Sequence, residues 1–126
     1  LGGKPAITQA IADTLITLLL PAVRQAHRAE DRINQRMQNL DVALALSAWR
    51  SEHDSYPKSL SDLVPKYLAV APTDRFNDEP LHYVLTPDGY LFYSVGDNGK
   101  DDEGHSFDDN PRGDDLPVKM PKPQAK

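Results

Sequence analysis

The sequence predicts an α+β domain in which a long N-terminal helix packs on a small antiparallel β-sheet. Residues 22–53 contain no Gly and are dominated by Ala, Leu, Arg, Gln and Glu, which are strong helix formers. Two runs rich in aromatic and β-branched residues, at 81–85 and 90–95, flank a turn sequence and indicate a hairpin. The chain has 126 residues, of which 39% are hydrophobic, enough for one small core.

The predicted helix runs from about Ala22 to His53, with Pro21 in its first turn or at a kink. Apolar residues recur at helical spacing, at Val23, Ala26, Ile33, Met37, Leu40, Leu44 and Ala48. Charged side chains surround this stripe in the N-terminal half, which we expect to be solvated and to protrude. Between Leu40 and Trp49 the apolar set widens, so we expect this half, Trp49 included, to pack into the core.

A short helix is predicted after the long one. Pro57 disfavours helical backbone at Tyr56 and so ends the long helix. Ser59 and Asp62 stand three residues apart in the pattern of a capping box, with Asp in place of the usual Glu. Leu60, Leu63 and Val64 would form the buried face of the one or two turns that follow.

The sheet is predicted to have a hairpin and a third strand. Pro87, Asp88 and Gly89 form the turn between the first two strands, where we expect Gly89 to adopt a positive φ. Residues 116–120 form the third strand, at an edge, because Pro117 has no backbone N–H to donate. We expect the tail, residues 121–126, to be disordered.

Composition excludes several classes of protein. The net charge of −5 argues against a nucleic-acid-binding protein, which needs a basic face. The absence of cysteine excludes a disulfide scaffold and a thiolate zinc site. The most apolar stretch, Ile11–Val23, has thirteen residues, which we judge too short to cross a bilayer. Residues 1–21 are therefore interpreted as the remnant or neighbour of a membrane anchor that lies upstream, and residues 22–120 as the folded domain.

An acidic segment between the hairpin and the third strand is the richest in chemistry. Residues 97–115, hereafter the acidic loop, contain eight acids and two bases, Lys100 and Arg112. The acids are Asp97, Asp101, Asp102, Glu103, Asp108, Asp109, Asp114 and Asp115. Their mutual repulsion leaves two alternatives: a solvated, disordered loop, or a compact loop neutralised by a hard cation such as calcium.

No catalytic constellation emerges from the residues. The four histidines include no pair at i, i+4, and Ser94 lacks the surrounding pattern of a nucleophile elbow. Paired acids such as Asp108 and Asp109 suit acid–base chemistry only when they are held rigidly. We therefore expect a protein that is not an enzyme and has no small-molecule substrate.

The order of motifs resembles a known bacterial family. The chain contains Leu18-Leu19-Leu20-Pro21-Ala22-Val23, a helix that ends before Tyr56-Pro57, Ser59-Leu60-Ser61-Asp62-Leu63, Pro72-Thr73-Asp74-Arg75-Phe76, a Tyr83 strand and Tyr93-Ser94-Val95-Gly96-Asp97-Asn98-Gly99. This order, from about Leu20 to Val118, is similar to that of the major pseudopilin of the type II secretion system and of related type IV pilin-like proteins.

The resemblance implies a calcium site in the acidic loop. Carried over residue by residue, the ligands would be the Val95 carbonyl, the Asn98 side chain and later acids. The candidates for these acids are Asp101, Asp102, Asp108, Asp109, Asp114 and Asp115. Asp114 and Asp115 are preferred because they precede the last strand, as the family's final acids do.

The resemblance also implies a structural or scaffolding subunit of a secretion or pilus-like assembly. Such a protein is extracytoplasmic, membrane-anchored and joined to protein partners or to copies of itself. The alternative is a calcium-independent extracytoplasmic interaction domain whose acidic loop binds a basic partner.

The chain departs from the family pattern at three places. It begins Leu1-Gly2-Gly3-Lys4-Pro5 and lacks the Phe-Thr-Leu-x-Glu of the family's anchor, so assembly through that Glu is not expected. Asp74-Arg75 replaces the usual Asp-Pro. Asn98 offers a neutral amide oxygen, which binds calcium more weakly than a carboxylate.

Overall fold

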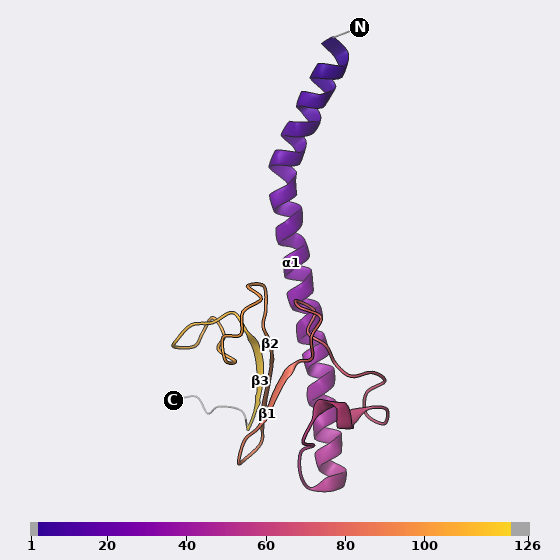
Figure 1. Ribbon diagram of the computed structural model, residues 1–126, viewed down its shortest axis with the longest axis vertical. Coiled ribbons are helices and arrows are strands. Elements are labelled where there is room, and N and C mark those ends of the chain that lie inside the picture. The colour runs from indigo at the N-terminus through magenta and orange to yellow at the C-terminus, as the bar shows by residue number, and fades with distance from the viewer. Residues whose placement is uncertain (1–2, 122–126) are drawn as a thin grey trace. The chain divides into compact units, whose positions relative to one another are not determined.

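The computed structural model describes the backbone of residues 3–121 and the side chains of residues 6–121. Helix α1 spans Gly3–His53 and a short 3-10 helix, η1, spans Leu60–Leu63. Strands β1, His82–Leu85, β2, Tyr90–Ser94, and β3, Leu116–Met120, form an antiparallel sheet in the order β1-β2-β3 (Figure 1). The α+β class is confirmed. The predicted disorder of the tail falls almost wholly on residues 122–126, outside the described residues.

Helix α1 is longer than predicted. It begins at Gly3, not near Ala22, and Pro21 lies inside it. The Ala, Ile and Leu residues before Pro21 are helix-compatible, and the hydroxyls of Thr14 and Thr17 donate to carbonyls one turn back, at 2.8 and 2.7 Å. Proline lacks one N–H donor, and here the flanking helical residues outweigh that loss.

The C-terminal end of α1 is where the sequence predicted it. His53 is the last helical residue, and Asp54 follows with a φ of 58°. The Asp54 amide donates to the Arg50 carbonyl at 2.8 Å, which satisfies one of the unpaired carbonyls of the last turn.

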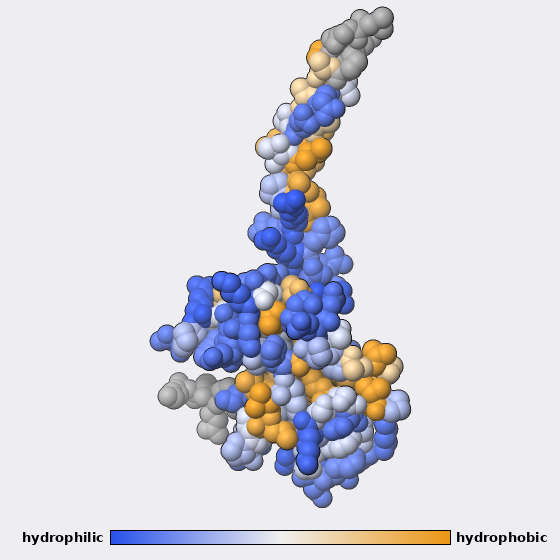
Figure 2. Space-filling model, viewed as in Figure 1, coloured by the Kyte–Doolittle hydropathy of each residue, from blue (hydrophilic) through white to orange (hydrophobic). Residues whose placement is uncertain are grey.

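The chain divides into two units, Leu1–Asp31 and Arg32–Lys126. In the first unit the described side chains are exposed apart from those of Ala12 and Asp31, which are half-buried. Large apolar side chains are exposed throughout its helix, at Ile7, Ile11, Leu15, Ile16, Leu18, Leu19, Leu20 and Val23. They appear as orange patches along the helix in Figure 2.

The length of this apolar segment corrects the sequence-based estimate. Thirteen residues appeared too short to span a bilayer, but α1 contains an 18-residue window that is long and apolar enough by length and composition. The difference arises because residues 6–10 are also helical and lengthen the apolar segment at its N-terminal end.

The core of the second unit lies between α1, η1 and the hairpin. Val42 and Leu46 of α1 pack with Leu63 of η1 and with Leu81 and Phe92. The predicted docking of the C-terminal half of α1 is therefore confirmed. Trp49 packs against this core and stacks on the ring of His53, with the ring centroids 4.1 Å apart.

The apolar stripe that predicted the helix is not its buried face. Ile33, Met37, Leu40 and Leu44, hereafter the apolar ridge, are between 51% and 62% exposed. Positions at i, i+4, i+7 and i+11 lie along one side of a helix, and the buried positions Gln35, Asn39, Val42 and Leu46 lie along the opposite side.

Two amides explain why this face is the buried one. Gln35 donates to Asn39 at 2.8 Å and accepts from the Arg75 amide at 2.9 Å. Asn39 donates to the Leu116 carbonyl at 3.2 Å, at the start of β3. Both side chains are almost fully buried, and each has partners, so their burial carries little penalty.

The sheet confirms the predicted hairpin and edge strand. Residues Thr86 and Gly89 exchange backbone hydrogen bonds of 3.0 and 3.3 Å across the turn. Gly89 does not have the positive φ that was expected. It is required there because a Cβ would overlap the Met120 carbonyl of β3. Pro117 lies in edge strand β3, opposite Tyr93.

The predicted capping box of η1 is confirmed. The Ser59 hydroxyl accepts from the Ser61 amide at 3.2 Å, and the Asp62 carboxylate accepts from the Ser59 amide at 3.3 Å. Leu60 and Leu63 are buried, as expected, whereas Val64 follows the last residue of η1 and is only half-buried.

Candidate functional site

The acidic loop follows Gly96, which lies two residues after the end of β2 at Ser94. Gly96 has a φ of +71°, and a Cβ at this position would overlap the Asp114 carbonyl. The two ends of the loop therefore lie side by side, and a larger residue than Gly would separate them.

Asp114, near the end of the loop, is hydrogen-bonded to the start of the loop and to α1. Its Oδ2 accepts from the Asn98 amide at 2.9 Å, and its Oδ1 accepts from an Arg32 guanidinium nitrogen at 3.1 Å. The same guanidinium nitrogen lies 3.1 Å from Asp97 Oδ2. One arginine thus partly neutralises two of the eight acids.

Asp102 and Asp115 bind backbone amides of the loop. Asp115 Oδ2 accepts from the amides of Asp102, at 3.0 Å, and Gly104, at 2.8 Å. Asp102 Oδ2 accepts from the Asp114 amide at 2.8 Å and the Asn98 side-chain amide at 2.9 Å. The Asn98 hydrogen bond, followed by that from the Asp114 amide, lowers the pKa of the Asp102 carboxyl.

Asp115 also carries an unsatisfied buried oxygen. The residue is 1% exposed, and among the described residues its Oδ1 has no hydrogen-bond partner. Burial raises the pKa of the Asp115 carboxyl, and its two backbone hydrogen bonds only partly oppose that effect. The ionised carboxylate is consequently the least well compensated charge of the loop.

The structure brings together four of the six predicted metal ligands: Asn98, Asp102, Asp114 and Asp115. It separates Asp101, whose Oδ1 accepts from the Tyr93 hydroxyl at 3.0 Å. The Val95 amide donates to Asp74 at 2.8 Å, which fixes the backbone that would present the Val95 carbonyl. Within residues 6–121 no three His, Cys, Asp or Glu side chains are arranged to hold a metal ion. Amide donors occupy the carboxylates instead.

Acids at the far end of the loop serve a local turn. Asp109 Oδ2 accepts from the Ser106 amide at 2.6 Å and from its hydroxyl at 3.0 Å. The amide hydrogen bond lowers the pKa of the Asp109 carboxyl. Asp108 is exposed. Neither acid is bonded to the four residues grouped above, so these alternatives to Asp114 and Asp115 lie apart from the cluster.

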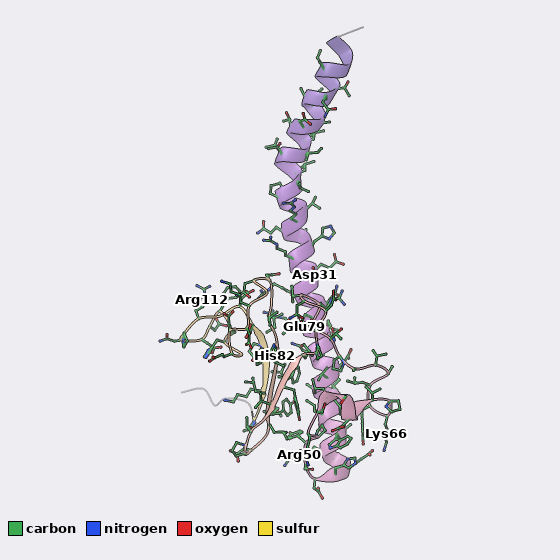
Figure 3. The ribbon with its side chains drawn as sticks, viewed as in Figure 1. Asp31, Arg50, Lys66, Glu79, His82 and Arg112 are labelled. Atoms are coloured by element: carbon green, nitrogen blue, oxygen red, sulfur yellow. The ribbon has the colours of Figure 1, made fainter. Side chains whose placement is uncertain are left out.

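Asp101 belongs to a second polar group on the sheet. The His82 ring stacks on Tyr93 at a centroid distance of 4.8 Å, and its Nδ1 lies 3.8 Å from Asp101 Oδ2. Burial, together with the hydrogen bond to Asp101, raises the pKa of Tyr93 to about 12. Figure 3 shows His82 on the sheet below the acidic loop.

Two residues that hold the site were not predicted from the sequence. Asp74 is fully buried and accepts from the Ser94 hydroxyl, at 2.8 Å, and from the Val95 amide. Arg32 was assigned to a solvated half of the helix. The Pro72–Phe76 motif was a signal for Asp74, whereas no sequence pattern linked Arg32 to acids more than 60 residues away.

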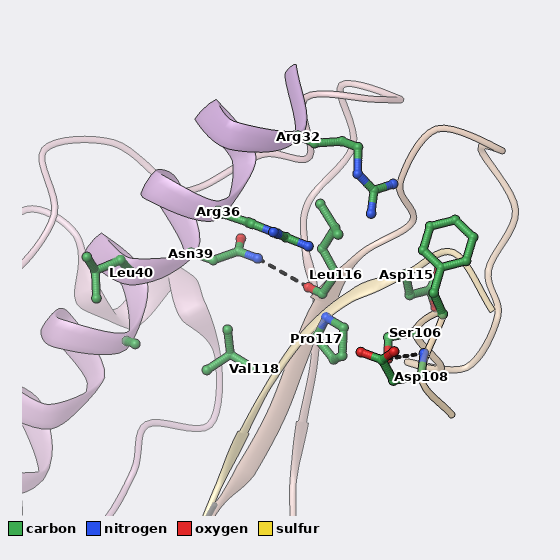
Figure 4. Close-up of a pocket in the computed structure, with 12 residues that line it drawn as sticks. Arg32, Arg36, Asn39, Leu40, Ser106, Asp108, Asp115, Leu116, Pro117 and Val118 are labelled. Carbon is green, nitrogen blue, oxygen red and sulfur yellow. Dashed lines mark hydrogen bonds between the residues drawn. The ribbon is translucent and has the colours of Figure 1, made fainter. Parts of the chain in front are cut away.

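A groove separates the α1 residues Arg36, Leu40 and Ala43 from β3 and the acidic loop (Figure 4). Asp115, Pro117 and Val118 form its other wall. The dashed line between Asn39 and Leu116 in Figure 4 marks the hydrogen bond that closes its floor.

No protein-family model, curated protein or solved structure matches this chain.

Proposed function

We propose that the chain is a non-enzymatic, pilin-like structural subunit that a membrane-inserted helix tethers to a lipid bilayer. Its α+β domain would be displayed on the extracytoplasmic side, as a scaffold in a secretion or pilus-like assembly. The observation that carries the proposal is the exposure of apolar side chains along α1.

The first unit supports the membrane tether. At about 100° per residue, the exposed Ile, Leu and Val residues between Ile7 and Val23 cover roughly 220° of the helix circumference, and Asp13, Thr14 and Thr17 lie on the remaining face. A helix with so broad an exposed apolar face is stable in a bilayer or against other helices, and not alone in water. Residues 6–23 contain one charged residue, Asp13, to which the Gln9 side chain donates at 2.9 Å.

The second unit supports assembly. The apolar ridge faces away from the core, although its spacing is that of a helix-packing surface. Exposed apolar positions in regular rows indicate a protein interface. A second copy of the chain would supply an identical ridge, which suits the self-assembly implied by the resemblance.

Calcium binding is the second part of the proposal. In the part of the chain that the structure describes, Asp115 Oδ1 is a buried oxygen without a hydrogen-bond donor. Hydrogen bonds link Asn98 to Asp114, Asp114 to Asp102 and Asp102 to Asp115. These residues, with the Val95 carbonyl, would supply the oxygen ligands that calcium prefers. The ion would neutralise the loop and hold its two ends together.

The membrane tether is tested by extraction. Alkaline carbonate extraction of membranes from cells that express the chain should leave it in the membrane pellet. A Leu18→Arg/Leu19→Arg variant should move to the supernatant, because each arginine near the helix centre costs about 2.5–3.5 kcal/mol. Extraction of the unmodified chain would contradict the tether.

Assembly is tested by thiol cross-linking, since the chain has no cysteine of its own. Met37→Cys and Leu44→Cys on the ridge should give dimers with a bis-maleimide. Lys58→Cys, which is also exposed, is the matched control. Equal yields at all three positions would contradict an interface at the ridge.

For the loop, we expect a calcium-selective rise of several degrees in melting temperature over excess chelator, with magnesium as the control. The rise should vanish in an Asp114→Ala/Asp115→Ala double variant. If calcium has no effect, the metal is excluded from the proposal and the structural role remains.

The alternative is a calcium-independent domain whose acidic loop binds a basic partner. It is favoured by the saturation of Asp102 and Asp114 with N–H donors, which hold the loop without a metal. Salt-sensitive binding of a polylysine probe, unchanged by chelator, would select this alternative.

A further inference from the structure

Two arginines follow the apolar segment of α1. Arg24 comes directly after Val23, and Arg28 lies one turn further, on the same side of the helix. Both side chains are exposed, and within residues 6–121 neither has a hydrogen-bond or ion-pair partner. Arg32, by contrast, is engaged by Asp97 and Asp114.

The charge around these two arginines is locally positive. No acid lies between Asp13 and Glu30. Glu30 lies 4.0 Å from the ring of His27, and within residues 6–121 neither Glu30 nor Asp31 forms an ion pair with Arg24 or Arg28. Although the chain as a whole carries a charge of −5, this turn of the helix presents two fixed positive charges.

The length of the helix places both arginines at the headgroup layer of a bilayer. At 1.5 Å per residue, residues 6–23 span about 27 Å, close to the roughly 30 Å of a hydrocarbon core. Along the helix axis, Arg24 and Arg28 then lie about 1.5 and 7.5 Å beyond Val23, at and just outside the edge of that core. The headgroup layer on each side is roughly 5–8 Å thick, so both guanidinium groups reach lipid phosphates.

We propose that Arg24 and Arg28 form a binding surface for the phosphates of anionic membrane lipids. This inference rests on the proposed insertion of α1 in a membrane. Guanidinium groups bind phosphate through paired N–H donors, and each basic residue near an anionic surface adds to the attraction. The contacts fix the depth of the helix and prevent Val23 from sliding out of the hydrocarbon core.

The test measures lipid selectivity around the reconstituted full chain. Spin-labelled phosphatidylglycerol and phosphatidylcholine are compared in phosphatidylcholine vesicles that contain the protein. We expect the motionally restricted fraction to favour phosphatidylglycerol roughly threefold to tenfold at low salt. An Arg24→Gln/Arg28→Gln variant should reduce this preference to about one.

An Arg36→Gln/Arg75→Gln variant is the matched control, because it removes the same charge from two other exposed arginines and should keep the preference. Equal selectivity in the two double variants would overturn the proposal. Failure of the unmodified chain to float with the vesicles would contradict membrane insertion itself, a different result from insertion without selectivity.

Discussion

Arg32 and Asp114 join the helix to the acidic loop: a guanidinium nitrogen of Arg32 lies 3.1 Å from Asp114 Oδ1. Their side chains are only 20% and 10% exposed. The Arg32 guanidinium also lies over the Phe107 ring, 5.2 Å from its centroid. A single side chain of α1 therefore holds the first acid of the loop, its aromatic residue and one of its last acids.

Replacement of Arg32 should weaken the attachment of the acidic loop to α1 and leave more of its negative charge uncompensated. We expect Arg32→Met to lower the free energy of unfolding by about 2 kcal/mol, because two charge-assisted contacts are lost. The same change should enlarge the calcium-dependent rise in melting temperature, because the cation would then have two more uncompensated carboxylates to neutralise. Calorimetry in chelator and in calcium measures both effects. Arg36→Met, at an exposed arginine, is the control, and an unchanged calcium response would contradict calcium in this loop.

Asp115→Asn should distinguish the destabilising effect of the buried Asp115 charge from a role of Asp115 as a calcium ligand. Because burial raises the pKa of this carboxyl, its ionised form destabilises the fold at pH values above its ordinary range. We expect the neutral variant to melt a few degrees higher than the unmodified chain at pH 7 in chelator. The difference should shrink as the pH falls through the raised pKa of the folded-state carboxyl, and it should vanish below the ordinary value of 3.8, where Asp115 is protonated in both the folded and the unfolded chain. In calcium the order should reverse, and a variant that still responds fully to calcium would show that Asp115 is not a ligand.

Asp109 should behave in the opposite way. Its lowered pKa means that the ionised form is favoured in the folded state, so its contribution is present above its ordinary value of 3.8 and is lost as the pH falls below it. Asp109→Asn should therefore lower the melting temperature at pH 7 and have little effect near pH 2. Melting curves across this range measure it, and a variant as stable as the unmodified chain at pH 7 would contradict the Ser106 contacts.

Gly96→Ala should be far more disruptive than Gly99→Ala. Both glycines have a positive φ, of 71° and 66°. A Cβ at Gly96 would overlap the Asp114 carbonyl, whereas a Cβ at Gly99 would meet nothing within 4 Å. We expect Gly99→Ala to cost about 1 kcal/mol, from strained backbone alone, and Gly96→Ala about 3 kcal/mol or more. Chemical denaturation compares the two, and equal costs would show that the loop ends are not in contact.

The apolar ridge should tolerate charge, whereas the buried face should not. Met37→Lys/Leu44→Lys should leave the melting temperature within a few degrees of the unmodified chain, and it should abolish the bis-maleimide dimers that a Leu40→Cys variant on the same ridge forms. Leu46→Ala, on the opposite face, should cost about 2–5 kcal/mol. A ridge variant that unfolds would show that this face belongs to the core.

The sequence by itself determined the local elements. The end of α1 at His53, the capping box of Ser59 and Asp62, the hairpin and the edge strand all depend on residues close together in the chain. Helix propensity, capping and turn formation depend on residues a few positions apart, so these elements can be predicted from the sequence without knowledge of the tertiary structure. The acidic loop was located for the same reason.

Only the tertiary structure decided which face of α1 is buried and which acids meet. Apolar residues occupy both faces of the helix, and the hydrogen bonds of Gln35 and Asn39 to distant backbone groups select one of them. Asn98, Asp102, Asp114 and Asp115 were grouped by a loop whose ends meet at Gly96, while Asp101 was drawn to Tyr93. Such contacts join residues far apart in the chain, where spacing carries no information about distance. Burial and hydrogen bonding in the folded state therefore fixed the composition of the site.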